Sequence, residues 1–399
     1  MSVFEEFLKK HCPDGVEYKQ IKDIAKINRG IIISKKYIEE NKGDYPVYSS
    51  QTENNGELGR INNYAYDGEY LTWTTDGANA GSVFYRNEKF NITNVCGLIK
   101  ITESNVITKF VYYILRIYAP KYVNRGMGNC KLMSNVMESI KIPIPPIEVQ
   151  KEIVRILDTF TKYQDLLNRE LELRKKQYEY YRDKLLTFTE GTQSCGDEVE
   201  WKCLGELLQP KGYIRGPFGS ALKKDFFVKD GVPVYEQQHA IYNKRVFRYF
   251  VDCERADKLK RFTVKPYDII ISCSGTIGKI SIIMPEDRIG IINQALLILR
   301  LDLSKVNVKY IKHYLECFPN LIVTSSGGAI TNIEKREIIE KIKIPVPQLE
   351  EQERIVKILD QFDTLCNDIT RGLPAEIELR KKQYEYYRDK LLTFKEKKK

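Results

Sequence analysis

The stretch Glu172–Phe188, ELRKKQYEYYRDKLLTF, recurs without a single change at Glu378–Phe394 in a chain of 399 residues. Shorter matches extend this repeat in both directions: Cys12–Lys19 (CPDGVEYK) with Cys195–Lys202 (CGDEVEWK), Tyr45–Tyr48 (YPVY) with Val232–Tyr235 (VPVY), and Ile140–Phe160 (IKIPIPPIEVQKEIVRILDTF) with Ile342–Phe362 (IKIPVPQLEEQERIVKILDQF). Similarity at this scale indicates two homologous halves in tandem.

Each half divides into a variable front and a near-identical back. The fronts, about residues 12–140 and 195–342, contain β-branched and aromatic runs interrupted by Gly, Asn and Pro, which predicts mixed β structure with some helix. The backs show the alternating four-three spacing of a narrow coiled-coil seam. The predicted seam residues are Val149, Ile153, Ile156, Phe160, Tyr163 and Leu167, then Ile355, Ile358, Phe362, Leu365 and Ile369, with Glu351 at the position that matches Val149.

The two backs differ at one place. The first predicts a nearly unbroken helix from Glu148 to Phe188, on the order of 60 Å long at 1.5 Å per residue. The second has four additional residues and contains Arg371–Ala375 (RGLPA), in which Gly372 suits a helix C-terminus and Pro374 the first turn of a new helix. We therefore expect a break in the second helix.

The predicted fold class is α+β: two mixed α/β domains joined by two long helices that pack as an antiparallel coiled coil, with a pseudo-twofold axis between the halves. The expected boundaries are 1–146 for the first domain, 147–190 for the first helix, 191–347 for the second domain and 348–399 for the broken second helix.

Two unlike globular fronts at the ends of a helical rod match a property of duplex DNA. Equivalent faces of the duplex recur every turn, about 34 Å or 10 base pairs, so two readers held by a rod recognise two half-sites at fixed separation. Because the fronts differ in sequence, the half-sites are expected to differ. The repeated stretch would then present equivalent surfaces to two copies of one partner. A recent duplication without such a role is an alternative explanation of the repeat.

The composition fits this interpretation. The net charge is +10, from 64 basic and 54 acidic residues, which favours a polyanionic partner. The 26 tyrosines could serve as interface anchors or reflect an AT-rich coding bias. Nine scattered cysteines with no metal-ligand spacing suggest reduced thiols. With no signal-peptide pattern or long apolar run, the expected location is cytoplasmic, without a membrane segment.

No stretch carries a convincing catalytic motif. Asp14, Glu17 and Lys19 have the letters of a metal-dependent nuclease, but two residues between Asp14 and Glu17 leave no room for a strand reversal, so a strand start is the better interpretation. Gly275–Lys279 is too short for a phosphate loop and predicts a glycine turn that exposes small polar groups. The three histidines lack triad-like neighbours, and we assign no catalytic residue and no metal site.

DNA contacts are expected from basic and small polar side chains on loops. The candidates in the first front are Ser50, Gln51, Asn54, Asn55, Thr74, Thr75, Asn79, Arg125 and Lys131, and those in the second are Arg215, Lys223, Lys224, Gln237, Gln238, Lys244, Arg245, Ser274, Thr276 and Lys279. Ser50, Gln51, Gln237 and Gln238 directly follow the aligned strand segments and are the foremost base-reading candidates. For each residue, a solvated loop is the alternative.

Taken in order and in duplicate, several of these stretches resemble the specificity subunit of type I restriction-modification systems. They are CPDGVEYK, Arg215–Lys224 (RGPFGSALKK), Ser272–Ile280 (SCSGTIGKI), Gly327–Ile333 (GGAITNI), both IKIP segments with Pro146–Gln150 and Gln348–Gln352, and both repeated helices. One departure is Gln348, which stands where the first half has Pro146.

The resemblance, which covers essentially the whole chain, implies a noncatalytic subunit. It implies that each domain reads one part of a bipartite, asymmetric target in double-stranded DNA. It further implies that the helices recruit two methyltransferase subunits, to which restriction or translocase subunits can add. No cofactor is expected in this chain, since S-adenosylmethionine, ATP and Mg would be bound by the partner subunits.

The tyrosine-rich repeat allows two interpretations, packing of the two helices on each other and docking of a methyltransferase helix. Tyrosines on different faces allow both. The candidate partner-binding residues are Tyr178, Tyr180, Tyr181, Tyr384, Tyr386 and Tyr387. Two functions of other classes also remain open: a coiled-coil scaffold whose ends bind protein, and a self-sufficient methyltransferase or nuclease with unrecognised motifs.

Overall fold

The computed structural model describes residues 3–126, 128–189, 193–194, 197–324 and 332–397. The chain divides into two compact units: unit 1 comprises residues 1–168 and 377–399, and unit 2 comprises residues 169–376. Each unit is therefore completed by helical residues from the other half of the sequence.

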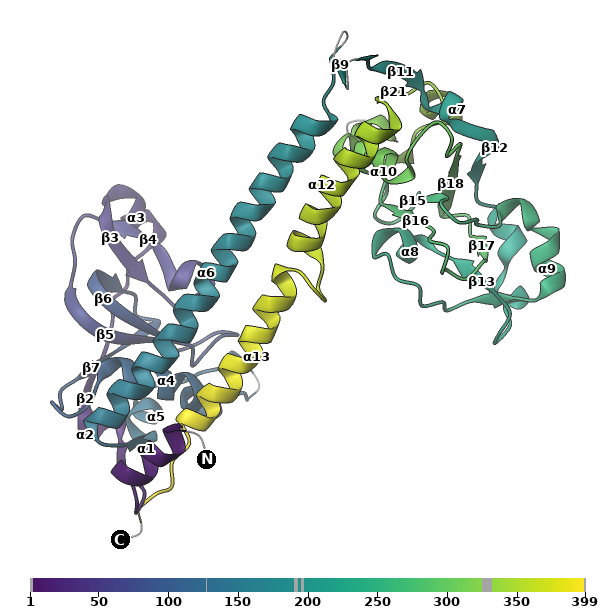
Figure 1. The fold of residues 1–399 in the computed structure, drawn as a ribbon. Coiled ribbons are helices and arrows are strands. Elements are labelled where there is room, and N and C mark those ends of the chain that lie inside the picture. The colour runs from purple at the N-terminus through teal and green to yellow at the C-terminus, as the bar shows by residue number, and fades with distance from the viewer. Residues whose placement is uncertain (1–2, 127, 190–192, 195–196, 325–331, 398–399) are drawn as a thin grey trace. The chain divides into compact units, whose positions relative to one another are not determined.

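Unit 1 is built around one twisted sheet (Figure 1). Its strand order is β2-β7-β5-β6-β3-β4, and neighbouring strands are antiparallel except β3 and β6. These strands are β2 (Ala25–Arg29), β3 (Lys42–Tyr48), β4 (Glu57–Ile61), β5 (Tyr66–Thr74), β6 (Val83–Ile92) and β7 (Cys96–Ile101). The other elements are α1 (Val3–His11), β1 (Glu17–Gln20), α2 (Ile21–Ile24), α3 (Lys35–Glu40), η1 (Glu53–Gly56), α4 (Thr108–Tyr118), η2 (Ala119–Tyr122), α5 (Ser134–Ser139) and β8 (Lys141–Ile144).

Unit 2 repeats the same strand order, divided over two sheets and with most of its strands shorter. A four-stranded sheet has the order β12-β18-β15-β16, and a three-stranded sheet has the order β14-β13-β17. These strands are β12 (Leu208–Arg215), β13 (Val232–Tyr235), β14 (Phe250–Val251), β15 (Ile269–Ser272), β16 (Ile280–Ile282), β17 (Ile291–Ile292) and β18 (Leu296–Leu301). The parallel pair of β13 and β17 corresponds to that of β3 and β6.

The remaining elements of unit 2 are mostly short. They are β9 (Gln193–Ser194), β10 (Asp197–Glu198), β11 (Glu200–Cys203), α7 (Leu204–Leu207), η3 (Gly219–Leu222), η4 (Lys224–Phe226), α8 (Gln237–Ile241), α9 (Cys253–Lys258), η5 (Lys260–Phe262), α10 (Val308–Cys317), η6 (Pro319–Leu321), β19 (Val323–Thr324), β20 (Asn332–Ile333), α11 (Arg336–Ile339) and β21 (Lys343–Val346). Gly327–Thr331 of the GGAITNI stretch lie outside the described residues.

The predicted long helix is present as α6, Ile147–Leu186, which begins in unit 1 and ends in unit 2. The second helical segment is in two pieces, α12 (Leu349–Asn367) and α13 (Leu373–Leu391), so the predicted break is confirmed. Pro374 lies in the first turn of α13, but Gly372 directly precedes that helix instead of ending α12. A Cβ at Gly372 would overlap the carbonyl oxygen of Thr364, so glycine allows the connection to fold tightly against α12.

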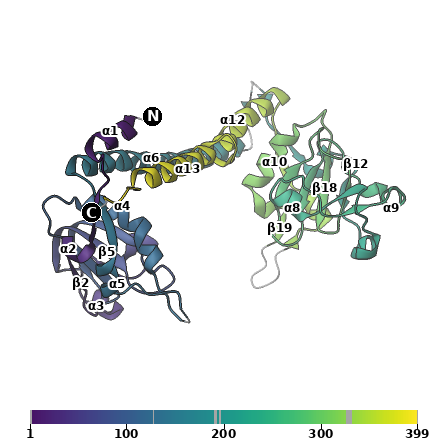
Figure 2. The same cartoon turned by 90° about the horizontal axis from the view of Figure 1, so that it is seen from below.

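The helices pack antiparallel within each unit. In unit 1, the start of α6 lies beside α13 in both views (Figures 1 and 2), and Phe160 stacks on Tyr387 at 5.7 Å between ring centroids. In unit 2, the end of α6 packs on α12, where Phe362 stacks on Tyr181 at 5.6 Å. The two contacts are equivalent under the repeat, which confirms the predicted fold class of two mixed α/β domains with an antiparallel helix pair.

The buried stripe of α6 is wider than the predicted seam. Val149, Ile153 and Leu167 are buried as expected, whereas Tyr163 is exposed and Leu157, outside the seam, is fully buried. Leu157 belongs to a core cluster that also contains residues of α4. The helix therefore packs on two neighbours, its own domain and the partner helix, which requires a broader apolar face than a coiled coil alone.

Candidate nucleic-acid interface

In unit 1, the polar residues after three strands gather into one hydrogen-bonded cluster. Ser50, which follows β3, donates to Asp76 Oδ1 at 2.8 Å. Thr75, which follows β5, donates to the Val95 carbonyl at 2.8 Å and accepts from Arg29 Nη2 at 3.1 Å. Arg29 ends β2 and was not predicted as a site residue, although its position directly before Gly30 matches that of Arg215. The cluster fixes the loops at this end of the sheet.

A second arginine supports the neighbouring turn. Asn54 and Asn55 have left-handed backbones, with φ of 47° and 54°, and Asn55 accepts from Arg86 Nη2 through its carbonyl at 2.7 Å. Arg86 is almost fully buried, with its guanidinium 3.5 Å from the centroid of the Tyr48 ring. Burial lowers the pKa of Arg86, although nearby tyrosine and glutamate groups oppose the shift. The turn thus presents both asparagine side chains from a rigid base.

The predicted residues of unit 1 differ in accessibility. Asn54, Asn55, Asn79, Arg125 and Lys131 are exposed, Ser50 and Gln51 are half-buried, and Thr74 and Thr75 are fully buried. Thr74 donates to the Asn79 carbonyl and accepts from the Ser82 amide. The two threonines hold the loop together from beneath, so we leave them out of the set proposed to touch DNA.

In unit 2, the predicted glycine turn between β15 and β16 is confirmed. Gly275 and Gly278 have φ of 69° and 77°, which favours glycine. Ser272 is buried; its hydroxyl donates to the Thr276 carbonyl at 2.6 Å and accepts from the Lys279 amide at 2.9 Å. This leaves the side chains of Ser274, Thr276 and Lys279 exposed on a fixed turn. Arg215, Lys223, Lys224 and Lys244 are also exposed.

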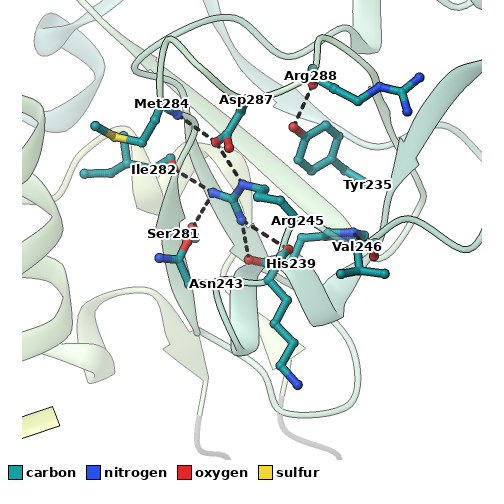
Figure 3. A network of polar contacts seen from close by, with 11 residues as sticks. Tyr235, His239, Asn243, Arg245, Val246, Ser281, Ile282, Met284, Asp287 and Arg288 are labelled. Carbon is teal, nitrogen blue, oxygen red and sulfur yellow. Dashed lines mark hydrogen bonds and ion pairs between the residues drawn. The ribbon is translucent and has the colours of Figure 1, made fainter. Parts of the chain in front are cut away.

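The guanidinium of Arg245 is bonded within unit 2, as Figure 3 shows. Its guanidinium donates to Asp287 Oδ2 at 2.8 Å, to Ser281 Oγ at 3.0 Å, and to the carbonyls of Ile282 at 2.8 Å and His239 at 3.2 Å. These bonds join the loop after α8 to β16 and the loop that follows β16. Arg245 therefore holds this loop in place, and the side chain of its neighbour Lys244 is exposed to solvent.

The side chains at the start of α8 are partly used inside the unit. Gln238 donates to Glu236 Oε2 at 3.1 Å, and Glu236 also accepts from Arg248 Nη2 at 2.9 Å. His239 is buried, and burial lowers the pKa of its imidazole, although hydrogen bonds from the ring to the carbonyls of Glu236 and Val246 oppose the shift. Gln237 and Gln238 remain half-buried at the site that corresponds to Ser50 and Gln51.

The joint between each domain and its helix was not predicted from the sequence. Gln150 on α6 is fully buried, accepts from the Ile107 amide at 2.9 Å, and donates to the carbonyls of Asn105 at 2.9 Å and Pro145 at 2.8 Å. Gln352 on α12 repeats this arrangement with the Asn307 amide at 2.8 Å and the Pro347 carbonyl at 2.7 Å. The identical placement of these glutamines in the two aligned halves was a signal that could have identified the joint.

An ion pair completes each joint. Lys109 on α4 contacts Asp158 at 2.7 Å, and Lys309 on α10 contacts Asp360 at 2.6 Å. His313 adds a hydrogen bond to Asp360 at 2.9 Å. Burial by itself would raise the pKa of Asp360, but the hydrogen bonds and charges of His313 and Lys309 outweigh it and lower that pKa to about 2.

The repeated helix exposes equivalent tyrosines in the two units. Tyr180 and Tyr386 are 60% and 63% exposed, and each forms an edge-on pair with the next tyrosine, Tyr181 or Tyr387. Tyr178 is half-buried and Tyr384 is buried against the helix pair. Tyrosines therefore serve helix packing on one face and remain accessible on another.

Patterns that imitate active sites have structural roles. Glu17 and Lys19 lie on β1, and their counterparts Glu200 and Lys202 lie on β11, in two-stranded pairs with β8 and β21. Within the described parts of the chain, no group of His, Cys, Asp or Glu side chains could hold a metal ion, and the eight cysteines described there are unpaired. None of the described helices has the length and apolar character needed to span a membrane.

Comparisons with known proteins agree with this architecture. The family model for the type I restriction modification DNA specificity domain matches twice, at residues 13–174 and 198–379. A Mycoplasma pneumoniae protein named as a type I specificity subunit is 33% identical over 94% of this chain and 97% of its own length. The MpnII specificity subunit of the same organism is 47% identical over 43% of this chain and 53% of its length. The crystal structure of a type I S subunit from M. genitalium has a TM-score of 0.55 at 16% identity, over 94% of this chain and 95% of that one, which indicates a shared fold.

Proposed function

Because the chain belongs to the type I restriction modification DNA specificity family, as its motifs predicted, we propose that each recognition domain reads one half of a bipartite, asymmetric DNA target. The chain is a noncatalytic specificity subunit. The observation that carries the proposal is the contrast within the repeat: the two domains share one topology, whereas the loops at their strand ends carry different polar and basic side chains.

The DNA contacts, to bases and to phosphates, are assigned to the exposed and half-exposed loop residues. In unit 1 these are Ser50, Gln51, Asn54, Asn55, Asn79, Arg125 and Lys131, and in unit 2 they are Arg215, Lys223, Lys224, Gln237, Gln238, Lys244, Ser274, Thr276 and Lys279. Amide and hydroxyl groups on rigid turns suit hydrogen bonds to base edges, and the lysines and arginines suit phosphates.

The helices are assigned the role of spacer. In this proposal residues 1–146 and 191–347 form the recognition domains, and residues 147–190 and 348–399 form the helices that separate them. Buried glutamines and ion pairs at both joints support a rigid attachment of each domain to its helix. A rigid attachment is what a fixed spacing between half-sites requires.

The exposed tyrosines of the repeated stretch are assigned to two methyltransferase subunits, one on each copy. Equivalent exposure of Tyr180 and Tyr386 supports two equal sites, because tyrosine supplies a large apolar contact and a hydrogen-bonding hydroxyl. Restriction or translocase subunits would join that assembly in the cytoplasm. S-adenosylmethionine, ATP and Mg would be bound by these partners.

Genome-wide methylation mapping tests the proposal. Cells that express the methyltransferase subunit with this chain should gain methylation at one bipartite motif, which should be absent without the chain. Inserting four residues between Leu167 and Leu171 lengthens α6 by about 6 Å and should change the spacer while both half-sites stay the same. Altered half-sites with an unchanged spacer would contradict the spacer role. Methylation by the purified chain alone would favour a self-sufficient enzyme, and absence of any sequence preference would favour a scaffold.

A further inference from the structure

Both recognition domains expose large apolar side chains at matched positions. Ile31 and Ile32 are 72% and 82% exposed and follow Arg29-Gly30, whereas Phe218 is 90% exposed and follows Arg215-Gly216-Pro217. The two arginines are the last residues of the corresponding strands β2 and β12, and the glycines follow directly. Exposing a large apolar side chain to water is unfavourable, and its recurrence at one site of a repeated fold requires an explanation.

We call the segments Ile31–Ile32 and Pro217–Phe218 the apolar tips. The backbone that precedes each tip is anchored in the same way. Gly30 donates to the carbonyl of Cys96, the first residue of β7, and Gly216 donates to that of Leu296, the first residue of β18, at 3.4 and 2.9 Å. A Cβ at Gly30 would overlap the Ile92 carbonyl, and one at Gly216 would overlap the Asn293 carbonyl. The glycines let both tips cross closely over a strand end, so each tip projects from a fixed base.

Positive charge surrounds the tips. Arg215, Arg261 and Arg336 line a hollow of about 490 Å³ together with Pro217 and Phe218, and Arg336 also pairs with Glu340 at 2.8 Å. In unit 1, Arg29 precedes the tip but is bonded to Thr75 and to the Asn94 carbonyl, and the exposed Lys35 and Lys36 follow it, with Lys36 paired to Glu40. An apolar side chain framed by cations suits a partner with an anionic surface and an apolar interior. Duplex DNA has both, in its phosphates and its stacked bases.

We propose that Ile31–Ile32 and Phe218 are wedges that insert between adjacent base pairs, one in each half-site, while the exposed cations beside them, Lys35 in unit 1 and Arg215 and Arg261 in unit 2, hold the phosphates. This inference rests on the proposed function and deepens it. Ile, Phe and Pro are among the residues that proteins use to unstack a base step and bend the duplex. The wedge adds sequence preference through the deformability of that step, without a hydrogen bond to its bases.

The test compares binding of the assembled complex to intact target DNA and to duplexes nicked at single positions in one half-site. A nick lets the duplex bend without help from a wedge. Phe218→Ala should weaken binding to the intact target by about 10- to 100-fold, since stacking on an aromatic ring is worth that much per base. A nick at one step of the half-site read by unit 2 should restore most of the affinity. Ile31→Ala with Ile32→Ala should give the same pattern in the other half-site.

Leu303→Ala is the matched control. Leu303 is also an exposed apolar residue of unit 2, but it lies beyond the last residue of β18, whereas Arg215 pairs near the first. The affinity of the Leu303→Ala complex for the intact target should stay within about twofold of wild type. The wedge proposal is overturned if the Phe218→Ala complex binds the intact target as tightly as wild type does. It is also overturned if Phe218→Ala loses the same factor in affinity on every nicked duplex. If the wild-type complex does not prefer its target over scrambled DNA, the proposed function itself fails.

Discussion

The joint between the first domain and α6 can be tested at Gln150. Replacement by Met keeps a long, flexible side chain but leaves the Ile107 amide and the carbonyls of Asn105 and Pro145 without their partner. An unsatisfied buried polar group costs about 1–3 kcal/mol, and two of the three bonds are only partly buried, so we expect a loss of about 3 kcal/mol. Gln352→Met leaves two such groups and should cost about 2 kcal/mol.

Hydrogen exchange followed by mass spectrometry reads the two joints separately. Gln150→Met should speed exchange of the Ile107 amide by about 100-fold and leave the Asn307 amide unchanged, and Gln352→Met should do the reverse. Gln361→Met, an exposed position on α12, is the control and should alter neither amide. Equal exchange in the Gln150→Met and Gln361→Met variants would refute the assignment of the buried glutamine as the joint.

Three further perturbations separate structural from binding roles. Lys244→Ala should weaken DNA binding and lower the slope of log affinity against log salt concentration by about one. Arg245→Ala should instead lower the free energy of unfolding by about 2–4 kcal/mol. Equal effects of the two variants in both the binding and the unfolding assay would contradict this division. Asp360→Asn should destabilise the chain at neutral pH, because a carboxyl with a lowered pKa stabilises the fold when it is ionised. In urea titrations the difference in unfolding free energy from wild type should fade as pH falls from about 4 to about 2. A difference that does not depend on pH would count against the ion pair. Tyr180→Ala and Tyr386→Ala should each reduce the methyltransferase stoichiometry from two to one by native mass spectrometry, with Tyr242→Ala as control, and full occupancy in the double variant would exclude this surface.

The architecture was predictable because its main signals are local or repeated. The identical stretches, the uninterrupted α6 and the break before α13 follow from sequence identity, periodicity and a proline at a helix start. The full width of the buried face of α6 was harder to predict. A periodic pattern identifies an apolar face, but it does not reveal that α6 packs on α4 as well as on another helix, which is why Leu157 was missed.

The individual site residues were less predictable, because a loop arginine or threonine has no periodic context. Arg245 donates a hydrogen bond to Asp287, which lies 42 residues later in the sequence. Thr75 donates one to the carbonyl of Val95, which lies 20 residues later. These partners are brought together only by the sheet topology. Gly30 and Gly216 show the opposite case, since their Arg-Gly pairs align in the two halves and the alignment alone could have drawn attention to the apolar residues that follow.

The contacts of the two joints explain how one helical frame can carry unlike recognition domains. In both halves the buried glutamine bonds only to backbone groups: the Ile107 amide and two carbonyls in unit 1, and the Asn307 amide and one carbonyl in unit 2. Backbone groups are present whatever side chains surround them. The loops at the far strand ends are therefore free to differ, provided that the strand and helix next to the joint keep their path. Under the proposed function, specificity would change by substitution in the loops without altering how the domain is held.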